Sequence, residues 1–199
     1  MGYWIMKRIK GITLLEILIT ILILSILVSA AGPSFVDSFK KGKLVSAAEQ
    51  MYSFLQQARS ESIARSEEVH FTVGNMTSAS WSYGMKVGAS CDPSKTSNTD
   101  PLACVLTIDD GDGSYSAAND DVLFRVDGSE HDELSIRMYY QSGTVTTSLV
   151  FDPTRGTVDA GRNFMFFDAS NNSIVVRVNR LGVVKICSDD YAEYSACDL

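Results

Sequence analysis

The feature that most constrains this chain is an apolar run near its N-terminus, ITLLEILITILILSILVSAA, which occupies Ile12–Ala31. A stretch of about 20 apolar residues is long enough to cross a lipid bilayer as a helix. The run contains one ionisable side chain, Glu16, near its start. Placing a carboxylate inside the hydrocarbon of a bilayer costs about 2.5–3.5 kcal/mol on insertion scales. A carboxylate at this position is therefore expected to have a function. We therefore expect a transmembrane helix at 12–31 with a functional carboxylate at Glu16.

Charged residues around the run indicate its orientation. Three cations precede it and three follow it: Lys7, Arg8, Lys10, Lys40, Lys41 and Lys43. The positive-inside rule is therefore nearly balanced, but the leading cluster lies closer to the run and favours a cytoplasmic N-terminus. The formal net charge of the whole chain is −7. An acidic surface disfavours nonspecific binding to nucleic acid or to anionic lipid.

The cysteines support the same orientation, because all four follow the apolar run, at Cys91, Cys104, Cys187 and Cys197. Disulfides persist in the periplasm and are rare in the cytosol. The cysteines form two close pairs in the sequence, which favours 91–104 with 187–197 among the three possible connectivities. A zinc site is disfavoured, since no C-x2-C spacing and no nearby histidine are present.

Beyond the run the pattern stays helical for some thirty residues. Gly32-Pro33 follows it directly, and a proline can kink a helix. Apolar and small residues then recur at three- and four-residue steps along one face: Phe35, Phe39, Leu44, Ala48, Met51, Leu55, Ala58 and Ser62. This spacing predicts an amphipathic continuation of the helix over 32–66, packed on whatever follows.

From residue 67 to residue 199 apolar and polar residues alternate, as is typical of strands. Gly, Asn, Asp and Ser separate the alternating segments. The expected strands are Val69–Val73, Trp81–Val87, Val105–Ile108, Val122–Val126, Leu134–Tyr140, Leu149–Asp152, Asn163–Phe167, Ile174–Val178 and Val183–Ile186. We expect no second helix of useful length. The fold class is therefore α+β, with one long helix on a small antiparallel β domain of one sheet or two.

The N-terminal residues resemble those of type IV pilins and pseudopilins, through the basic leader, Gly11 and Glu16. The resemblance implies that a prepilin peptidase removes a leader of residues 1–11 by cutting between Gly11 and Ile12, and that Ile12 is then methylated. Members of this family usually carry Phe at the first mature position, so Ile12 is a departure. The resemblance also implies that Glu16 pairs with the N-terminal amine of a neighbouring subunit during assembly, and that the helix continues past Pro33.

Three further segments resemble the GspH/FimT/FimU group of minor pilins and pseudopilins: LQQARSESIAR at 55–65, FDPTRG at 151–156 and VVKIC at 183–187. This resemblance implies a β domain of two sheets and a low-copy subunit that helps to initiate or cap a filament. Its implied partners are other minor and major pilins, the prepilin peptidase and the inner-membrane assembly platform. The implied location is the inner membrane, with a single span and a periplasmic C-terminal domain, and then the cell surface after assembly.

Two alternative functions stay open. A minor pseudopilin of type II secretion would use the same anchor, so the sequence does not separate it from a minor type IV pilin. A DNA-binding pilin for natural transformation would carry Gly-Arg-x-Arg before its last strand cysteine, but this chain reads GVVK at 182–185. The candidate DNA contacts are Arg177, Arg180 and Lys185. Acidic residues crowd the same end of the chain, so we expect no measurable DNA binding at physiological salt.

Neither a metal cofactor nor catalysis is expected. Asp110, Asp112, Ser114 and Asp121 have the spacing of calcium ligands in an EF-hand, but Tyr115 stands where that loop needs Gly, and position twelve is Asp instead of Glu. An acidic turn explains the segment better. The two histidines, His70 in a strand and His131 in an acidic loop, lie in no nucleophile or metal motif. The chain is therefore not expected to be an enzyme and is expected to use no cofactor.

The processing hypothesis predicts a chain that starts at Ile12. Mass spectrometry of the protein purified from membranes of cells with an active prepilin peptidase should show this start, with one methyl group on the N-terminal amine. An intact Met1 start in such cells would contradict the resemblance to pilins.

Overall fold

The computed structural model describes residues 12–78, 80–131 and 133–197, and within them all side chains except those of residues 30–34. The chain divides into two compact units, Met1–Lys41 and Gly42–Leu199. One helix, α1, extends over Leu14–Arg65 and includes Gly32 and Pro33. Among the described residues, no helix combines the length and apolarity needed to cross a membrane. The bilayer span at 12–31 and the kink at Pro33 stay predictions.

In the second unit, α1 buries one face against the β domain. The expected core positions from Leu44 to Ser62 are all fully buried, and Ala47 joins them. This result confirms the amphipathic prediction from Leu44 onward. Phe35 and Phe39 were expected on the same face but belong to the first unit, where they are 66 % and 68 % exposed and pack on each other with ring centroids 6.3 Å apart. The core begins one helical turn later, at Leu44.

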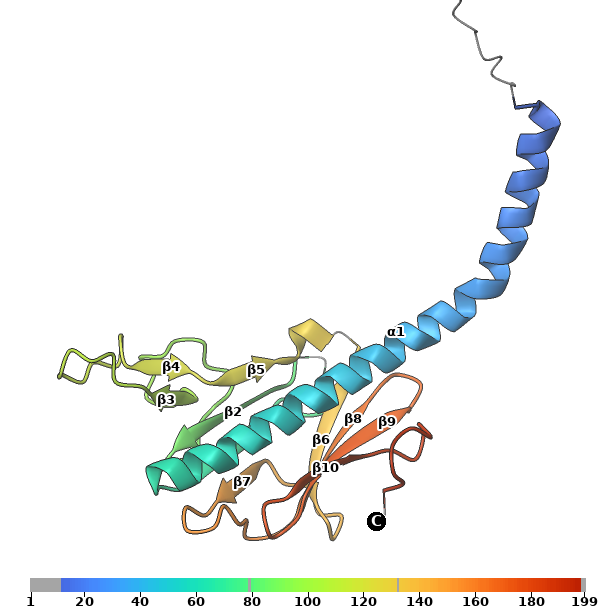
Figure 1. The fold of residues 1–199 in the computed structure, drawn as a ribbon. Helices are drawn as coiled ribbons and strands as arrows, with labels where there is room; N and C mark the ends of the chain where they lie inside the picture. Colours follow the sequence, from blue (N-terminus) through green and yellow to red (C-terminus); the bar gives the residue numbers. More distant parts are fainter. Residues whose placement is uncertain (1–11, 79, 132, 198–199) are drawn as a thin grey trace, which may run out of the picture. The chain divides into compact units, whose positions relative to one another are not determined.

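Over its described residues, the β domain contains two four-stranded antiparallel sheets and a two-stranded ribbon (Figure 1). The first sheet has the order β5-β2-β1-β7, the second has the order β10-β9-β8-β6, and the ribbon pairs β3 with β4. The strands are β1 (Val69–Gly74), β2 (Ser82–Val87), β3 (Val105–Thr107), β4 (Asp121–Leu123), β5 (Arg125–Asp127), β6 (Ser135–Tyr140), β7 (Ser148–Phe151), β8 (Arg162–Phe167), β9 (Ser173–Val178) and β10 (Val184–Cys187).

One expected strand is in fact two. The segment Val122–Val126 divides at Phe124 into β4 and β5, which belong to different sheets. The backbone N–H of Phe124 donates to the carbonyl of Cys104 at 2.8 Å, whereas its carbonyl accepts from the N–H of Met85 at 3.1 Å. The chain therefore leaves the β3–β4 ribbon and joins β2 at this residue. Alternation in the sequence does not reveal such a change of partner.

His131 is buried, although it was expected in a polar loop. It ends a short 3-10 helix, η1 (Gly128–His131), and is only 6 % exposed. Its ring stacks on Trp81 with centroids 6.0 Å apart, and its Nε2 lies 3.1 Å from Oε1 of Gln50 on α1. Burial lowers the pKa of His131, with Lys43 acting in the same direction and Glu130 opposing it.

Two of the segments that resemble the GspH/FimT/FimU group, and Gly182 just before the third, meet at Arg59 of α1. A Cβ added to Gly156 would lie 2.7 Å from Cγ of Arg59, and one added to Gly182 would lie 1.9 Å from the carbonyl oxygen of Gly156. Both glycines have positive φ, at 61° and 72°. The helix and the turns after β7 and β9 are thus in direct contact through positions that accept no side chain.

This contact predicts a large effect of Gly182→Ala on stability. The left-handed backbone costs a residue with a Cβ about 1–2 kcal/mol, and the clash with Gly156 adds about 1–3 kcal/mol. Gly143→Ala is the matched control, because Gly143 also has positive φ but has no atom within 4 Å of the added Cβ. Urea unfolding followed by tryptophan fluorescence should show a clearly larger loss for Gly182→Ala. Equal losses would contradict the packing at Arg59.

The environment of His131 predicts a pH dependence of folding. Its pKa is lowered in the folded state, so the unfolded chain binds the proton more tightly. The stabilisation is complete above the unfolded pKa of about 6.5 and is lost as the pH falls below it. Urea unfolding between pH 7.5 and pH 5 should show this decline, and His131→Gln should reduce its slope. His70→Gln removes the other histidine and is the control. An unchanged slope in His131→Gln would refute the assignment.

Candidate functional site: the start of the helix and its apolar shaft

The first turn of α1 is capped by Thr13. The hydroxyl of Thr13 accepts a hydrogen bond from the backbone N–H of Glu16 at 3.2 Å, and its carbonyl accepts from the N–H of Ile17 at 3.3 Å. The spacing Thr13-x-x-Glu16 is that of a capping box, in which the acidic side chain can return to the N–H of the capping residue. Thr13 was not identified as a site residue from the sequence, although the Thr-x-x-Glu spacing is apparent there.

The carboxylate of Glu16 therefore lies in the first turn of the helix, which the helix dipole favours for an anion. Ile12 precedes the cap directly and is 71 % exposed. Ile12 and Glu16 are four residues apart, a spacing that brings side chains to one helix face. Gly11, the other residue of the expected cleavage site, lies outside the described residues. A cut after Gly11 would place a new amine one residue before the capping Thr13.

The helix that follows is apolar around its whole circumference. From Ile12 to Val28 the large apolar side chains of the described residues are between 48 % and 79 % exposed. A helix that is apolar on every side is stable when other apolar groups surround it. We call residues 14–29 the shaft.

Polar side chains of the shaft are satisfied within the helix. The hydroxyls of Thr20, Ser25 and Ser29 donate to the carbonyls three residues before them, at 2.8, 2.7 and 2.9 Å. Such bonds remove the need for water as a partner. Glu16 is the only ionisable side chain of the shaft.

Both disulfides join the cysteines that are close in sequence. Cys91 is bonded to Cys104 and Cys187 to Cys197, with Cα atoms 5.0 and 5.1 Å apart. The first bond closes the loop between β2 and β3, and the second ties the C-terminal segment to β10. These are the two pairings that the sequence spacing favours.

The candidate DNA contacts divide into a pair and a separate residue. Arg177 and Lys185 are cross-strand neighbours on β9 and β10, and Nε of Arg177 donates to Oδ1 of Asn163 at 3.0 Å. Arg180 is exposed in the following turn, where its carbonyl accepts from the N–H of Val158. The carboxylate of Asp190 accepts from the backbone N–H of Ser173, which begins β9.

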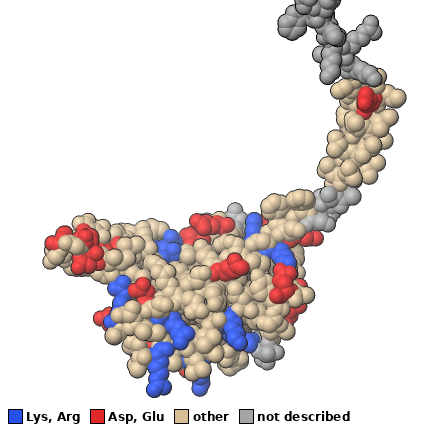
Figure 2. All heavy atoms as spheres, in the orientation of Figure 1, with Lys and Arg blue, Asp and Glu red and all other residues tan. Residues whose placement is uncertain are grey.

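The four residues with EF-hand spacing, which the sequence disfavours as calcium ligands, do not share one cluster. Asp112 accepts hydrogen bonds from the N–H and hydroxyl of Ser114, which lower the pKa of Asp112. Asp121 instead accepts from the hydroxyls of Thr107 and Tyr115. The carboxylates that converge are those of Asp109, Asp110 and Asp120. Figure 2 shows the acidic side chains gathered at the end of the β3–β4 ribbon, as an acidic turn predicts.

A long helix with an apolar shaft, capped beside a single carboxylate and followed by two antiparallel sheets on its amphipathic half, defines a pilin-like filament subunit. The chain belongs to the GspH family: the family model described as type II transport protein GspH matches residues 47–182. The prokaryotic N-terminal methylation motif matches residues 6–32.

Two solved structures are similar to this chain, both of the type IV minor pilin FimU from Pseudomonas aeruginosa strain PAO1, in two crystal forms. Each is 19 % identical in sequence, and the TM-scores are 0.49 and 0.44. The matches cover 73 % and 72 % of this chain, and 89 % and 91 % of the FimU chains. No protein of curated function matches the sequence significantly.

Proposed function

We propose that this chain is a minor filament subunit of the pilin class. It is made as a precursor with a leader of residues 1–11, is cut after Gly11 and is methylated at Ile12. The segment 12–31 anchors it in the inner membrane, with the C-terminal domain in the periplasm. The observation that carries this proposal is the capped, predominantly apolar shaft with Glu16 as its one ionisable group.

Assembly would transfer the shaft from lipid into a bundle of similar helices. Both surroundings are apolar, so the exposed side chains of the shaft change partners at little cost. Glu16 is the exception, because a buried carboxylate is stable only when paired. We propose that it pairs with the Ile12 amine of a neighbouring subunit, which would fix the axial position of one subunit against the next. The partners would be other minor and major pilins, served by the prepilin peptidase and the assembly platform.

The machine that we propose is a type IV pilus, in which the chain would help to initiate or cap the filament. The second candidate is the pseudopilus of type II secretion, which the description of the matching family model favours. Deletion of the gene separates the two. Loss of surface pili with normal protein export supports the pilus, whereas loss of export with normal pili supports the secretion system. DNA binding has less support, because Arg177 is engaged by Asn163 and the chain is acidic.

The assembly role predicts the behaviour of Glu16→Gln. Leaving the partner amine buried without its counter-charge costs about 3–5 kcal/mol, so incorporation into filaments should fall at least tenfold. Membrane insertion should be unchanged or improved, because the substitution removes an insertion penalty. Immunoblots of sheared filaments and of membranes measure the two quantities separately.

Glu49→Gln is the matched control, since Glu49 is an exposed glutamate on the same helix, in the second unit. It should enter filaments at the wild-type level. Wild-type incorporation of Glu16→Gln would show that the carboxylate serves only to cap the helix, and the pairing proposal would then be wrong.

A further inference from the structure

A polar cavity of about 670 Å³ lies in the second unit. It is bounded by the end of α1, the end of β2 and the two long polar loops, 88–104 and 108–120. Six of its lining residues carry the argument: Arg65, Lys86, Asn98, Asp100, Tyr115 and Asp121. The volume falls within the range of about 300–1,000 Å³ that is typical of small-molecule sites.

The walls of the cavity are held in place by bonds between its elements. Nδ2 of Asn98 donates to three carbonyls of the facing segment, at Ala117, Ala118 and Asp121. Nζ of Lys86 donates to the carbonyl of Pro101 at 2.6 Å, and Nη1 of Arg65 donates to that of Thr107 at 2.9 Å. These bonds join the first loop to the second loop, to β2 and to β4, and they join the helix to β3, so little ordering remains for a ligand to induce.

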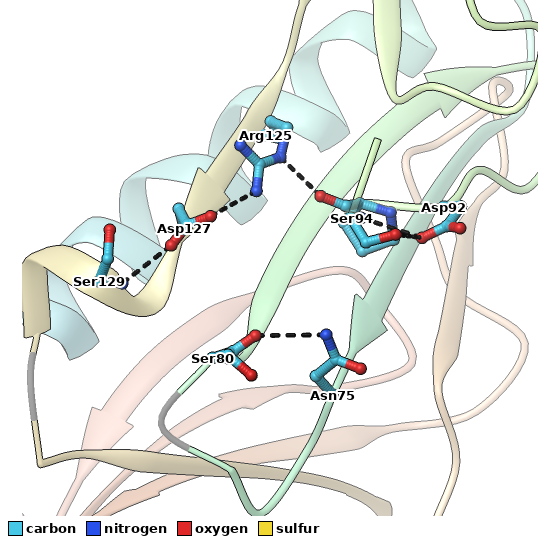
Figure 3. Close-up of polar contacts among 8 residues, drawn as sticks. Asn75, Ser80, Asp92, Ser94, Arg125, Asp127 and Ser129 are labelled. Carbon is cyan, nitrogen blue, oxygen red and sulfur yellow. Dashed lines mark hydrogen bonds and ion pairs between the residues drawn. The ribbon is translucent and has the colours of Figure 1, made fainter. Parts of the chain in front are cut away.

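The base of the first loop is fixed as well. The disulfide between Cys91 and Cys104 closes it. Figure 3 shows Arg125 of β5 bonded to Asp127 and to the turn in which Asp92 accepts from Ser94. The loop is thus a rigid wall, although it contains little secondary structure.

The side chains of the cavity combine one open aromatic ring with balanced charges. Tyr115 is 69 % exposed, and its hydroxyl donates to Oδ2 of Asp121 at 2.8 Å. This bond raises the pKa of Tyr115 and holds the phenol neutral while the ring stays accessible. The lining includes the cations Arg65 and Lys86 and the carboxylates of Glu67, Asp100 and Asp121. A nearly balanced lining disfavours strongly charged ligands.

We propose that this cavity binds a neutral oligosaccharide of about two sugar rings. One ring would stack on Tyr115, whose apolar face suits the C–H groups of a pyranose. Sugar hydroxyls both donate and accept hydrogen bonds. The cavity offers N–H donors on Lys86 and Arg65, and oxygen acceptors on Asp121 and on Oδ1 of Asn98. One aromatic platform among side-chain donors and acceptors fits a sugar better than a peptide, whose side chains need a row of apolar pockets. The inference does not depend on filament assembly.

Nuclear magnetic resonance titration tests the proposal on the full chain, in a detergent without a sugar headgroup. The probes are four disaccharides: N,N′-diacetylchitobiose, lactose, maltose and cellobiose. At least one should bind saturably and shift the amide signals of Tyr115, Asn98 and Lys86. Tyr115→Ala should weaken that binding at least tenfold, whereas Tyr115→Phe, which keeps the ring, should weaken it less.

Leu181→Ala is the control, because Leu181 is similarly exposed, at 65 %, but does not line the cavity. It should bind the sugar as the wild type does, and unchanged spectra away from position 115 would show that the variants fold. Three results would overturn the proposal: no saturable binding of any of the four sugars, binding that survives Tyr115→Ala, or shifts at the cavity that follow only protein concentration and so indicate a second copy of the chain.

Discussion

The packing of the β domain depends on the burial of one face of α1. Residues from Leu44 to Ala58 are inserted into the same core as Phe71, Tyr83 and Phe164 of the sheets. Phe54 of the helix makes edge contacts with Phe71 and Tyr83, with centroids 5.9 and 5.1 Å apart. Short strands of three to six residues bury too little apolar surface by themselves. The helix supplies the common surface on which both sheets pack.

The two halves of α1 differ in where they find apolar packing partners. The second half is amphipathic and finds its apolar partner within its own chain. The shaft is apolar on every side and finds none there, since the large apolar side chains of its described length are exposed. Its hydroxyls bond to its own carbonyls, and Glu16 is its one ionisable side chain. This division between self-contained packing and packing that needs neighbours is what a filament subunit requires.

The β domain carries features that the packing of α1 does not explain. The disulfide of Cys91 and Cys104, the amide of Asn98 and the guanidinium of Arg125 all hold a polar loop in one conformation. Ordering these loops costs conformational entropy. A loop that only connects two strands would not need to lose this entropy. Their order makes the cavity beside Tyr115 a second place where function can reside, independent of the shaft.

The sequence by itself determined the shaft, the carboxylate at Glu16, the buried stripe from Leu44 to Ser62, the disulfide pairing and most of the strands. These depend on local properties: helical and strand periods, hydropathy and short sequence spacings. Only the tertiary structure decided that residues 122–126 divide between two sheets at Phe124, that His131 is stacked on Trp81, and that the carboxylates of Asp109, Asp110 and Asp120 converge. Only the tertiary structure places Arg59 in contact with Gly156 and Gly182, and only the tertiary structure forms a cavity between two loops. Each of these depends on which distant segments become neighbours, and the period of a single segment does not specify the partner against which it packs.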